Sequence, residues 1–429
     1  MALVKPFRGV VYNMKKIKDA RSVMAPPYDI IPPATQETLY RKHPQNIIRL
    51  ELGRILKTDS ARNNRYTRAG KFFTSWLKNN TLIQDEKEAF YIYGQEYTDR
   101  GRPITRIGVL GLMSFGGGPK DGAMPHEKTL KAPKEDRLNL MREVKANLSP
   151  IFVLFEGRGK KLTPFLKSYC ASHRPLVTVR WDDGRHKIWR LDDPAAIEKI
   201  SAGIGASNLF IADGHHRFET AKNYARELAK SGASRQAVER AKALMVYFVE
   251  SDEKMLTVLP AHRLPRDIGT LDVATIMKRL EPYFTIEKKP SFTAMMRRLG
   301  ALTAKHAFGM YAGEGRYYIL RLKDPRQSDR AIKDKPKDWK RLDVSILHFF
   351  IFRHVLGIKD TDDNVEFVKD PREAARMVDR KELPLAFFLN PTKAAQVRRI
   401  ARLGERMPRK ATYFYPKPLT GLVINRLAG

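Results

Sequence analysis

The segment Asp213–Arg217 reads DGHHR and holds three side chains able to bind an anion, His215, His216 and Arg217. Placed at the start of a helix, they suit a phosphate, because first-turn N–H groups lack helical partners and the helix dipole is positive there. Histidines are also common metal ligands. Neighbouring helical residues diverge by about 100°, so His215 and His216 are not expected to ligate one ion. A solvated first turn without any ligand explains the same spacing and stays open.

A strand and a helix are expected to position these side chains. Leu209–Ala212 is an apolar run too short for a helix and typical of a buried strand. Asp213 is a preferred helix N-cap, and apolar residues recur at helical spacing from Phe218 to Ala229. Because Leu244–Glu250 is the next apolar run, we expect strand, helix and strand joined by a parallel crossover. The turn would then lie at a carboxyl end of the sheet, where ligands tend to bind.

Further candidates for proton transfer lie in loops bounded by proline or glycine. Pro26 and Pro27 fix an extended or turning path that would deliver Asp29 to a defined place. His126 and Glu127 follow a glycine-rich loop, and either side chain could accept a proton from a substrate. A structural turn at Asp29, and loop or capping residues at His126 and Glu127, explain the same pattern and also stay open.

Other motifs narrow the chemistry. The sequence contains no GxxxxGK[ST], GxSxG, HExxH or cysteine-based zinc pattern. Its one cysteine, Cys170, has no neighbours that mark it as a nucleophile. Met407–Lys417 is basic and aromatic, and either closes over an anionic ligand or packs as a tail. What remains is a helix N-terminus, several loop carboxylates and basic groups, which suits phosphoryl transfer.

The DGHHR motif and blocks along the whole chain resemble known families. ADGHHRFETA is similar to the signature of the ParB/sulfiredoxin-like superfamily, which includes nucleotide-hydrolysing chromosome-partition proteins, sulfiredoxin and kinases of free L-serine. The chain also resembles the bacterial and archaeal domain-of-unknown-function family 1015. The blocks that carry this second resemblance are Ala25–Ile31, Asn46–Leu52, Pro125–Thr129, Ala146–Phe152, Ala212–Ala221, Pro260–Arg263 and Met407–Lys417.

The resemblance implies an α/β fold (mixed α+β), with a ParB/sulfiredoxin-like nucleotide-binding core and additional N- and C-terminal α/β modules. It also implies a cytoplasmic kinase that uses ATP or ADP with Mg²⁺ and phosphorylates free L-serine to O-phosphoserine. In this arrangement Asp213 caps the helix or helps to place Mg²⁺, and the acceptor base is Glu127 or Asp29, with His126 beside it. The residues expected to hold the nucleotide are Gly214, His215, His216, Arg217 and Thr220.

The charge of the chain keeps two other classes open. The 80 Lys and Arg residues against 47 Asp and Glu residues give a formal net charge of +33. Such a field attracts nucleic acid, so a ParB-like, DNA-binding nucleotide hydrolase and a non-catalytic nucleic-acid-binding protein are the alternatives. Against both, the basic residues are scattered and do not alternate with stacking aromatics, and no helix-turn-helix is evident. A solvated surface that is basic throughout explains the same charge without nucleic acid, and both explanations stay open.

Length and composition bound the architecture. The 429 residues, 42% of them hydrophobic, suffice for two or three domains with a large core. We expect segments at 1–118, 119–264 and 265–429, the middle one carrying His126, Glu127 and the DGHHR motif. No apolar stretch approaches 18 residues, which predicts that no helix spans a membrane. Without an apparent signal peptide or a disulfide, the cytoplasm is the expected compartment.

Overall fold

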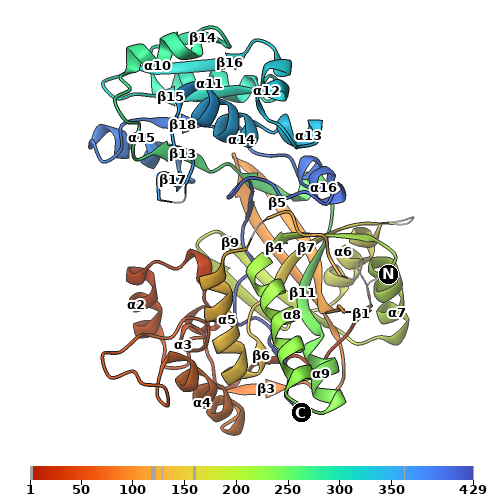
Figure 1. Ribbon diagram of the computed structural model, residues 1–429. Helices are drawn as coiled ribbons and strands as arrows, with labels where there is room; N and C mark the ends of the chain where they lie inside the picture. The colour runs from red at the N-terminus through yellow and green to blue at the C-terminus, as the bar shows by residue number, and fades with distance from the viewer. Residues whose placement is uncertain (1–2, 117–121, 128, 158–160, 362, 429) are drawn as a thin grey trace. The chain divides into compact units, whose positions relative to one another are not determined.

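The computed structural model describes residues 3–116, 122–127, 129–157, 161–361 and 363–428 (Figure 1). Helices and several sheets make up the chain, which confirms the predicted mixed α/β class. The three segments divided at residues 118 and 264 stay a prediction. By compactness the chain forms two units: unit 1 contains Met1–Pro125, Thr129–Thr257 and Pro416–Gly429, and unit 2 contains His126–Lys128 and Val258–Tyr415.

Unit 1 is built on an eight-stranded sheet of described residues, in the order β10-β7-β11-β5-β4-β9-β8 with β1 paired to β5. The residues Asp182–Arg185 are typical of a hairpin turn, and β8 and β9 form the antiparallel pair around them. Short pairs β2–β3 and β6–β20 lie outside this sheet. The strands of unit 1 are β1 (Val4–Lys5), β2 (Val10–Tyr12), β3 (Leu82–Gln84), β4 (Phe90–Asp99), β5 (Arg102–Ser114), β6 (Ala146–Asn147), β7 (Ile151–Glu156), β8 (Val177–Trp181), β9 (Gly184–Leu191), β10 (Asn208–Asp213), β11 (Ala243–Glu250) and β20 (Asn425–Arg426).

One face of this sheet packs against helices. Ile151, Val153 and Phe155 alternate along β7 and share a buried core with Ile200 of α7 and Phe218 of α8. Figure 1 shows α5 and α8 side by side, and their residues are in contact. The helices and single turns of unit 1 are α1 (Ala20–Val23), η1 (Tyr28–Ile30), α2 (Pro33–Lys42), α3 (Ile48–Glu51), α4 (Arg65–Lys78), α5 (Lys131–Val144), α6 (Leu162–Ser172), α7 (Pro194–Gly205), α8 (His215–Lys230), α9 (Arg235–Ala241) and η2 (Glu253–Met255).

The opposite face of the sheet packs against segments from far along the sequence. The Tyr91 hydroxyl accepts a hydrogen bond from the Gly9 amide at 2.9 Å, and the Tyr93 hydroxyl accepts one from the Leu419 amide at 3.2 Å. The intervening Ile92 points to the helical side, as strand alternation requires. With both faces covered, the central strands β7 and β11 are buried along most of their length, as their continuous apolar sequences predict.

The expected parallel crossover around the DGHHR turn is wrong. Strand β10 is antiparallel to β7, and β11 is parallel to β7, so β10 and β11 run in opposite directions. β7 lies between them in the sheet. Two helices, α8 and α9, make the connection, and α9 lies beyond the end of α8 (Figure 1). The apolar pattern of a single helix could not reveal the direction in which the chain re-enters the sheet.

Unit 2 is a second α/β unit around a six-stranded sheet of described residues, in the order β14-β16-β15-β18-β13-β17. The chain enters this unit through β12 (Thr257–Leu259) and leaves it through β19 (Tyr413–Tyr415), and these two strands pair. The other strands are β13 (His262–Pro265), β14 (Phe284–Lys289), β15 (Ala307–Tyr311), β16 (Tyr317–Leu322), β17 (Val365–Val368) and β18 (Ala386–Phe388). The helices are α10 (Val273–Leu280), α11 (Phe292–Ala301), α12 (Pro325–Ala331), α13 (Lys337–Lys340), α14 (Asp343–Ser345), the π-type η3 (Ile346–Leu356), α15 (Pro371–Asp379) and α16 (Ala394–Arg402).

Among the described residues, no helix is both long enough and apolar enough to cross a bilayer.

Candidate active site

The DGHHR turn joins β10 directly to α8. Gly214 is the N-cap of the helix, with φ 92° and no side chain to occupy the helix end. A Cβ atom on Gly214 would lie 2.8 Å from Cγ2 of Ile151, so the turn needs glycine both for its backbone angle and for space. Asp213 is the last residue of β10, and the expectation that it caps the helix is wrong. Its carboxylate binds cations instead.

Asp213 lies in a network of buried charges. Its Oδ2 atom accepts a hydrogen bond from Nη2 of Arg217 at 2.8 Å, and its Oδ1 atom accepts one from Nζ of Lys417. The same Nζ lies 2.6 Å from Oδ2 of Asp29. The Lys417 side chain is only 6% exposed, against 38% for Asp29. The structure therefore brings together two predicted site carboxylates, and a single lysine bridges them.

Mutual attraction determines the charges of this network. Burial alone would raise the pKa of Asp29, but the Lys417 ammonium, followed by the Arg217 guanidinium, lowers it overall. Burial would lower the pKa of Lys417, yet Asp213 and Asp29 raise it. Burial likewise opposes the charge of Arg217, and the same two carboxylates raise its pKa. Asp29, Lys417 and Arg217 are all ionised at neutral pH.

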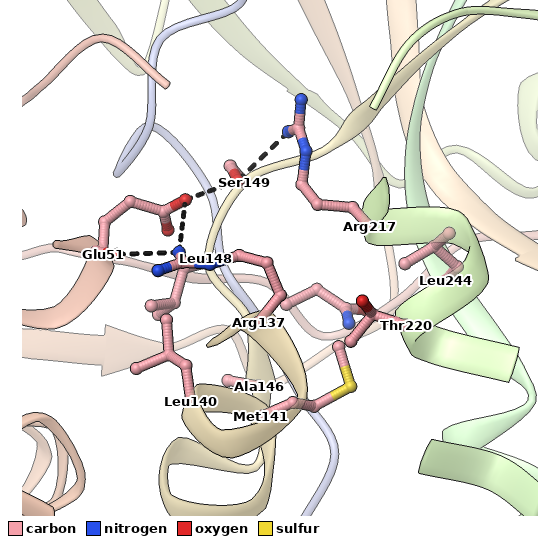
Figure 2. A pocket seen from close by; sticks show the side chains of 11 residues that line it. Glu51, Arg137, Leu140, Met141, Ala146, Leu148, Ser149, Arg217, Thr220 and Leu244 are labelled. Carbon is pink, nitrogen blue, oxygen red and sulfur yellow. Dashed lines mark hydrogen bonds and ion pairs between the residues drawn. The ribbon is translucent and has the colours of Figure 1, made fainter. Parts of the chain in front are cut away.

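Arg217 also lines a small pocket of unit 1, where a hydrogen bond connects it to Ser149 (Figure 2). Its Nη1 atom donates to Oγ of Ser149 at 3.1 Å, and that hydroxyl donates to Oε1 of Glu51 at 3.2 Å. Arg137 lies 3.6 Å from the same Glu51 oxygen, and its guanidinium stacks on the ring of Tyr28. The pocket volume of about 40 Å³ has room for a few water molecules but not for a nucleotide. The lining residue Ser149 holds the Arg217 guanidinium by a hydrogen bond, and Glu51 in turn accepts a hydrogen bond from Ser149.

Glu51 is a buried glutamate whose pKa is shifted from its usual value. Its side chain is 3% exposed, and burial raises its pKa although Arg137 and Arg217 lower it. The carboxyl therefore takes up a proton more readily in the folded protein than in water. None of Glu51, Arg137 and Ser149 was a predicted site residue. Glu51 and Ser149 lie in sequence blocks that resemble family 1015, but no motif in these blocks specified a role for either residue.

His216 acts as a hydrogen-bonding group in this structure. Its Nε2 atom accepts a hydrogen bond from the Leu130 amide at 3.0 Å, which leaves the ring proton on Nδ1. Burial lowers the pKa of His216, so the side chain is neutral at physiological pH and can offer a phosphate an N–H but no charge. His215 is buried, and the Thr220 hydroxyl donates to the Lys134 carbonyl at 3.3 Å. The predicted nucleotide contacts of these residues stay predictions.

His126 and Glu127 belong to unit 2. His126 is buried there, where its Nε2 atom lies 3.1 Å from Oγ1 of Thr412 and its carbonyl accepts a hydrogen bond from the Met407 amide at 2.7 Å. These contacts connect His126 to the block near Met407 within one unit. The roles of Glu127 and His126 in catalysis stay predictions, and Lys128 lies outside the described residues.

A protein-held metal ion does not fit the groups of unit 1 as they are arranged. Across the described ranges, no cluster of three or more His, Cys, Asp or Glu side chains is placed to bind one. Asp213, the predicted Mg²⁺ ligand, has one carboxylate oxygen bound to Lys417 and the other to Arg217. An ion at Asp213 would have to displace one of these cations. The assignment of Asp213 as a metal ligand stays a prediction.

The fold places the chain in the class of mixed α/β proteins. Comparison with known families gives a more specific assignment. A family model described as "Protein of unknown function (DUF1015)" matches residues 4–345. The chain belongs to this family, which confirms the resemblance carried by the blocks. No curated protein matches the chain significantly.

Several solved structures resemble the chain weakly. A conserved hypothetical protein from Pyrococcus furiosus is 13% identical over 71% of this chain and 92% of that one, with a TM-score of 0.33. A free serine kinase in complex with AMP is 13% identical over 68% of this chain and 83% of that one, with a TM-score of 0.32. SbnI with a C-terminal truncation, from Staphylococcus aureus, is 12% identical over 72% and 85%, with a TM-score of 0.34. Scores this low assign no ligand or reaction to this chain.

Proposed function

We propose that this protein is a nucleotide-dependent phosphotransferase that transfers a phosphoryl group from ATP or ADP to the hydroxyl group of a small molecule. The observation that carries the proposal is the DGHHR turn. Gly214 leaves the N-terminus of α8 without a capping side chain, and Arg217 on the first turn supplies a fixed positive charge. Backbone amides and a cation at a helix N-terminus form a common phosphate site.

Asp29 is the acceptor base that unit 1 supplies. Lys417 keeps its carboxylate ionised, and it lies beside Asp213 at the start of the turn. In the proposed step the acceptor hydroxyl gives its proton to Asp29, and its oxygen attacks the terminal phosphorus. The bond from that phosphorus to the bridging oxygen breaks, and ADP leaves from ATP, or AMP from ADP. Arg217 and Lys417 offset the negative charge of the phosphoryl group in the transition state of the transfer.

Glu127 is the second candidate for the base, and its side chain lies in the other unit. The resemblance to free L-serine kinases supports serine as the acceptor. A nucleotide would use Gly214, His215, His216, Arg217 and Thr220, as the sequence predicts.

The test is a phosphate-transfer assay with purified protein, Mg²⁺ and either ATP or ADP, with and without L-serine. Phosphoserine is measured in the wild type and in His216→Ala, with His173→Ala as the matched control because His173 is exposed at the end of α6. We expect product in the wild type and the control, and little in His216→Ala. Asp29→Asn and Glu127→Gln then separate the two bases, because the true base should be needed for transfer but not for nucleotide binding.

Two outcomes would contradict the proposal. If no phosphoserine forms, and nucleotide is consumed faster when DNA is added, the protein is a partition-type nucleotide hydrolase. If neither nucleotide is bound or consumed, and DNA binding depends steeply on salt in both histidine variants, the protein is a non-catalytic nucleic-acid-binding protein.

A further inference from the structure

The short segment Pro416–Thr420 carries Lys417 to the carboxylates of the candidate site. This segment follows unit 2 in the sequence and belongs to unit 1. Lys417 is separated from Asp29 by 388 residues and from Asp213 by 204 residues, yet its ammonium group contacts both. The side chain is 6% exposed, so two opposite charges compensate the cost of burying it.

The sheet holds this segment by its backbone, not only by the lysine side chain. Gln95 Nε2 donates to the Lys417 carbonyl at 3.3 Å, and Arg106 donates to the Pro416 carbonyl. The Thr420 amide donates to the Ala25 carbonyl at 2.9 Å, close to η1, which contains Asp29. The position of Lys417 Nζ is therefore fixed relative to both carboxylates.

A network of buried side chains makes one more contact with the segment, at the Leu419 amide. The Tyr93 hydroxyl accepts from the Leu419 amide, so its own proton is directed to Nδ1 of His186 at 2.6 Å. Nε2 of His186 then carries a proton and donates to Asp183 at 2.8 Å. Tyr93 and His186 are almost completely buried. This network therefore ends on the backbone of the segment that carries Lys417.

Two carboxylates that share one contact point need a cation between them, because like charges at short range repel strongly. In many phosphotransferases a divalent metal ion supplies that charge. Here Nζ of Lys417 lies between Asp29 and Asp213, and Arg217 takes the remaining Asp213 oxygen. Both carboxylate oxygens of Asp213 and one oxygen of Asp29 therefore already have cationic partners.

We infer that Lys417 is the built-in cation of this site and takes the place of a metal ion at Asp213. This inference rests on the proposed phosphotransferase function. Lys417 lowers the pKa of Asp29, contacts the Asp213 carboxylate as well and, with Arg217, presents positive charge to a phosphate at the start of α8. Any Mg²⁺ that arrives with the nucleotide is then held by the phosphates and not by Asp213.

Mn²⁺ binding without nucleotide, followed by electron paramagnetic resonance, tests the inference independently of catalysis. Lys417→Ala should bind Mn²⁺ at least about tenfold more tightly than the wild type, a difference of about 1.4 kcal/mol. Adding Asp213→Asn to that variant should remove the gain. In the wild type, Asp213→Asn should leave Mn²⁺ binding unchanged, and this measurement stands even if Lys417→Ala does not fold.

Amine rescue provides the second readout. Lys417→Ala deletes three carbons and the ammonium group, so n-propylammonium matches the missing atoms and 1-propanol is the neutral control. The amine should displace Mn²⁺ from Lys417→Ala and raise its unfolding temperature, and the alcohol should do neither. Lys417→Arg, which keeps the charge, should not gain the Mn²⁺ site.

Three results would overturn the inference. They are a wild-type Mn²⁺ site that Asp213→Asn removes, no gain of Mn²⁺ binding in a folded Lys417→Ala variant, and equal rescue by alcohol and amine. A wild-type protein that transfers no phosphate while the Mn²⁺ and amine results hold would refute the proposed function and leave the assignment of Lys417 intact.

Discussion

Substituting Gly214 with alanine should destabilise unit 1 by two separable mechanisms. The first is backbone strain, because φ is 92° and an L-residue in the left-handed region costs about 1–2 kcal/mol. The second is overlap, because the new Cβ would lie 2.8 Å from Cγ2 of Ile151 and 3.1 Å from Nη2 of Arg217. Overpacking of this kind costs about 1–3 kcal/mol. We therefore expect Gly214→Ala to lower the free energy of unfolding by about 2–5 kcal/mol.

Gly232 provides a matched control just beyond the other end of α8. Its φ is 74°, in the same left-handed region, but a Cβ there would meet no atom within 4 Å. Gly232→Ala should therefore show the backbone strain alone, about 1–2 kcal/mol. The difference between the two variants isolates the overlap with Ile151 and Arg217, and we expect it to be about 1–3 kcal/mol.

Urea unfolding followed by tryptophan fluorescence measures both variants. The chain has four tryptophans, and Trp76, Trp181 and Trp189 lie in unit 1. In a Trp339→Phe background, which removes the reporter of unit 2, the signal follows unit 1 alone. If Gly214→Ala costs no more than Gly232→Ala, then the DGHHR turn is not held tightly against its neighbours. The reasoning that glycine is required there for space would be refuted.

Burial lowers the pKa of His262 to about 3 from its usual 6.5, so the stability of unit 2 should fall by about 1.4 kcal/mol per pH unit as the pH drops through this window. Urea unfolding of His262→Phe at several pH values should show a shallower slope, and an unchanged slope contradicts the assignment. Because the pKa of Glu51 is raised, its ionised form destabilises unit 1, and Glu51→Gln should gain stability relative to wild type as the pH rises above the usual glutamate pKa of 4.5. A relative stability that falls over this range would show that Glu51 is stabilised as the anion. Arg217→Met leaves Asp213 with one cation instead of two and should cost about 3–5 kcal/mol in urea unfolding, where a cost under about 1 kcal/mol would indicate a solvent-screened pair.

Local patterns in the sequence predicted the local structure well. The apolar run before Asp213 and the helical spacing after Gly214 are confirmed as β10 and α8, because each pattern records which side chains are buried. The turn residues Asp182–Arg185 likewise join the antiparallel strands β8 and β9, because turn residues act on their own backbone. The identity of the N-cap was wrong by one residue, because Asp213 binds more distant cations instead of the first-turn amides.

The direction of β11 and the composition of the site depend on long-range packing and were not predictable in the same way. The helix α9 has only 7 residues, Arg235–Ala241, so the second helix between β10 and β11 left no clear periodic signal in the sequence. Asp29 and Asp213 were each candidates, but no spacing rule joins residues so far apart. Lys417 stood in a basic, aromatic stretch with two open interpretations, and only the contacts of its ammonium group assign it to the carboxylates.

The path of the chain couples unit 2 to the site in unit 1. The chain leaves unit 1 after Thr257 and returns to it at Pro416. All residues of unit 2 from Val258 to Tyr415 therefore precede Lys417 in the sequence and separate it from the earlier part of unit 1. A disordered loop of this length would add about 2 kcal/mol of closure entropy relative to a loop of about ten residues. Unit 2 avoids that cost when it folds, because the strands through which the chain enters and leaves it, β12 and β19, pair with each other. Folding of unit 2 thus places Pro416 near Thr257 and favours docking of the segment that carries Lys417.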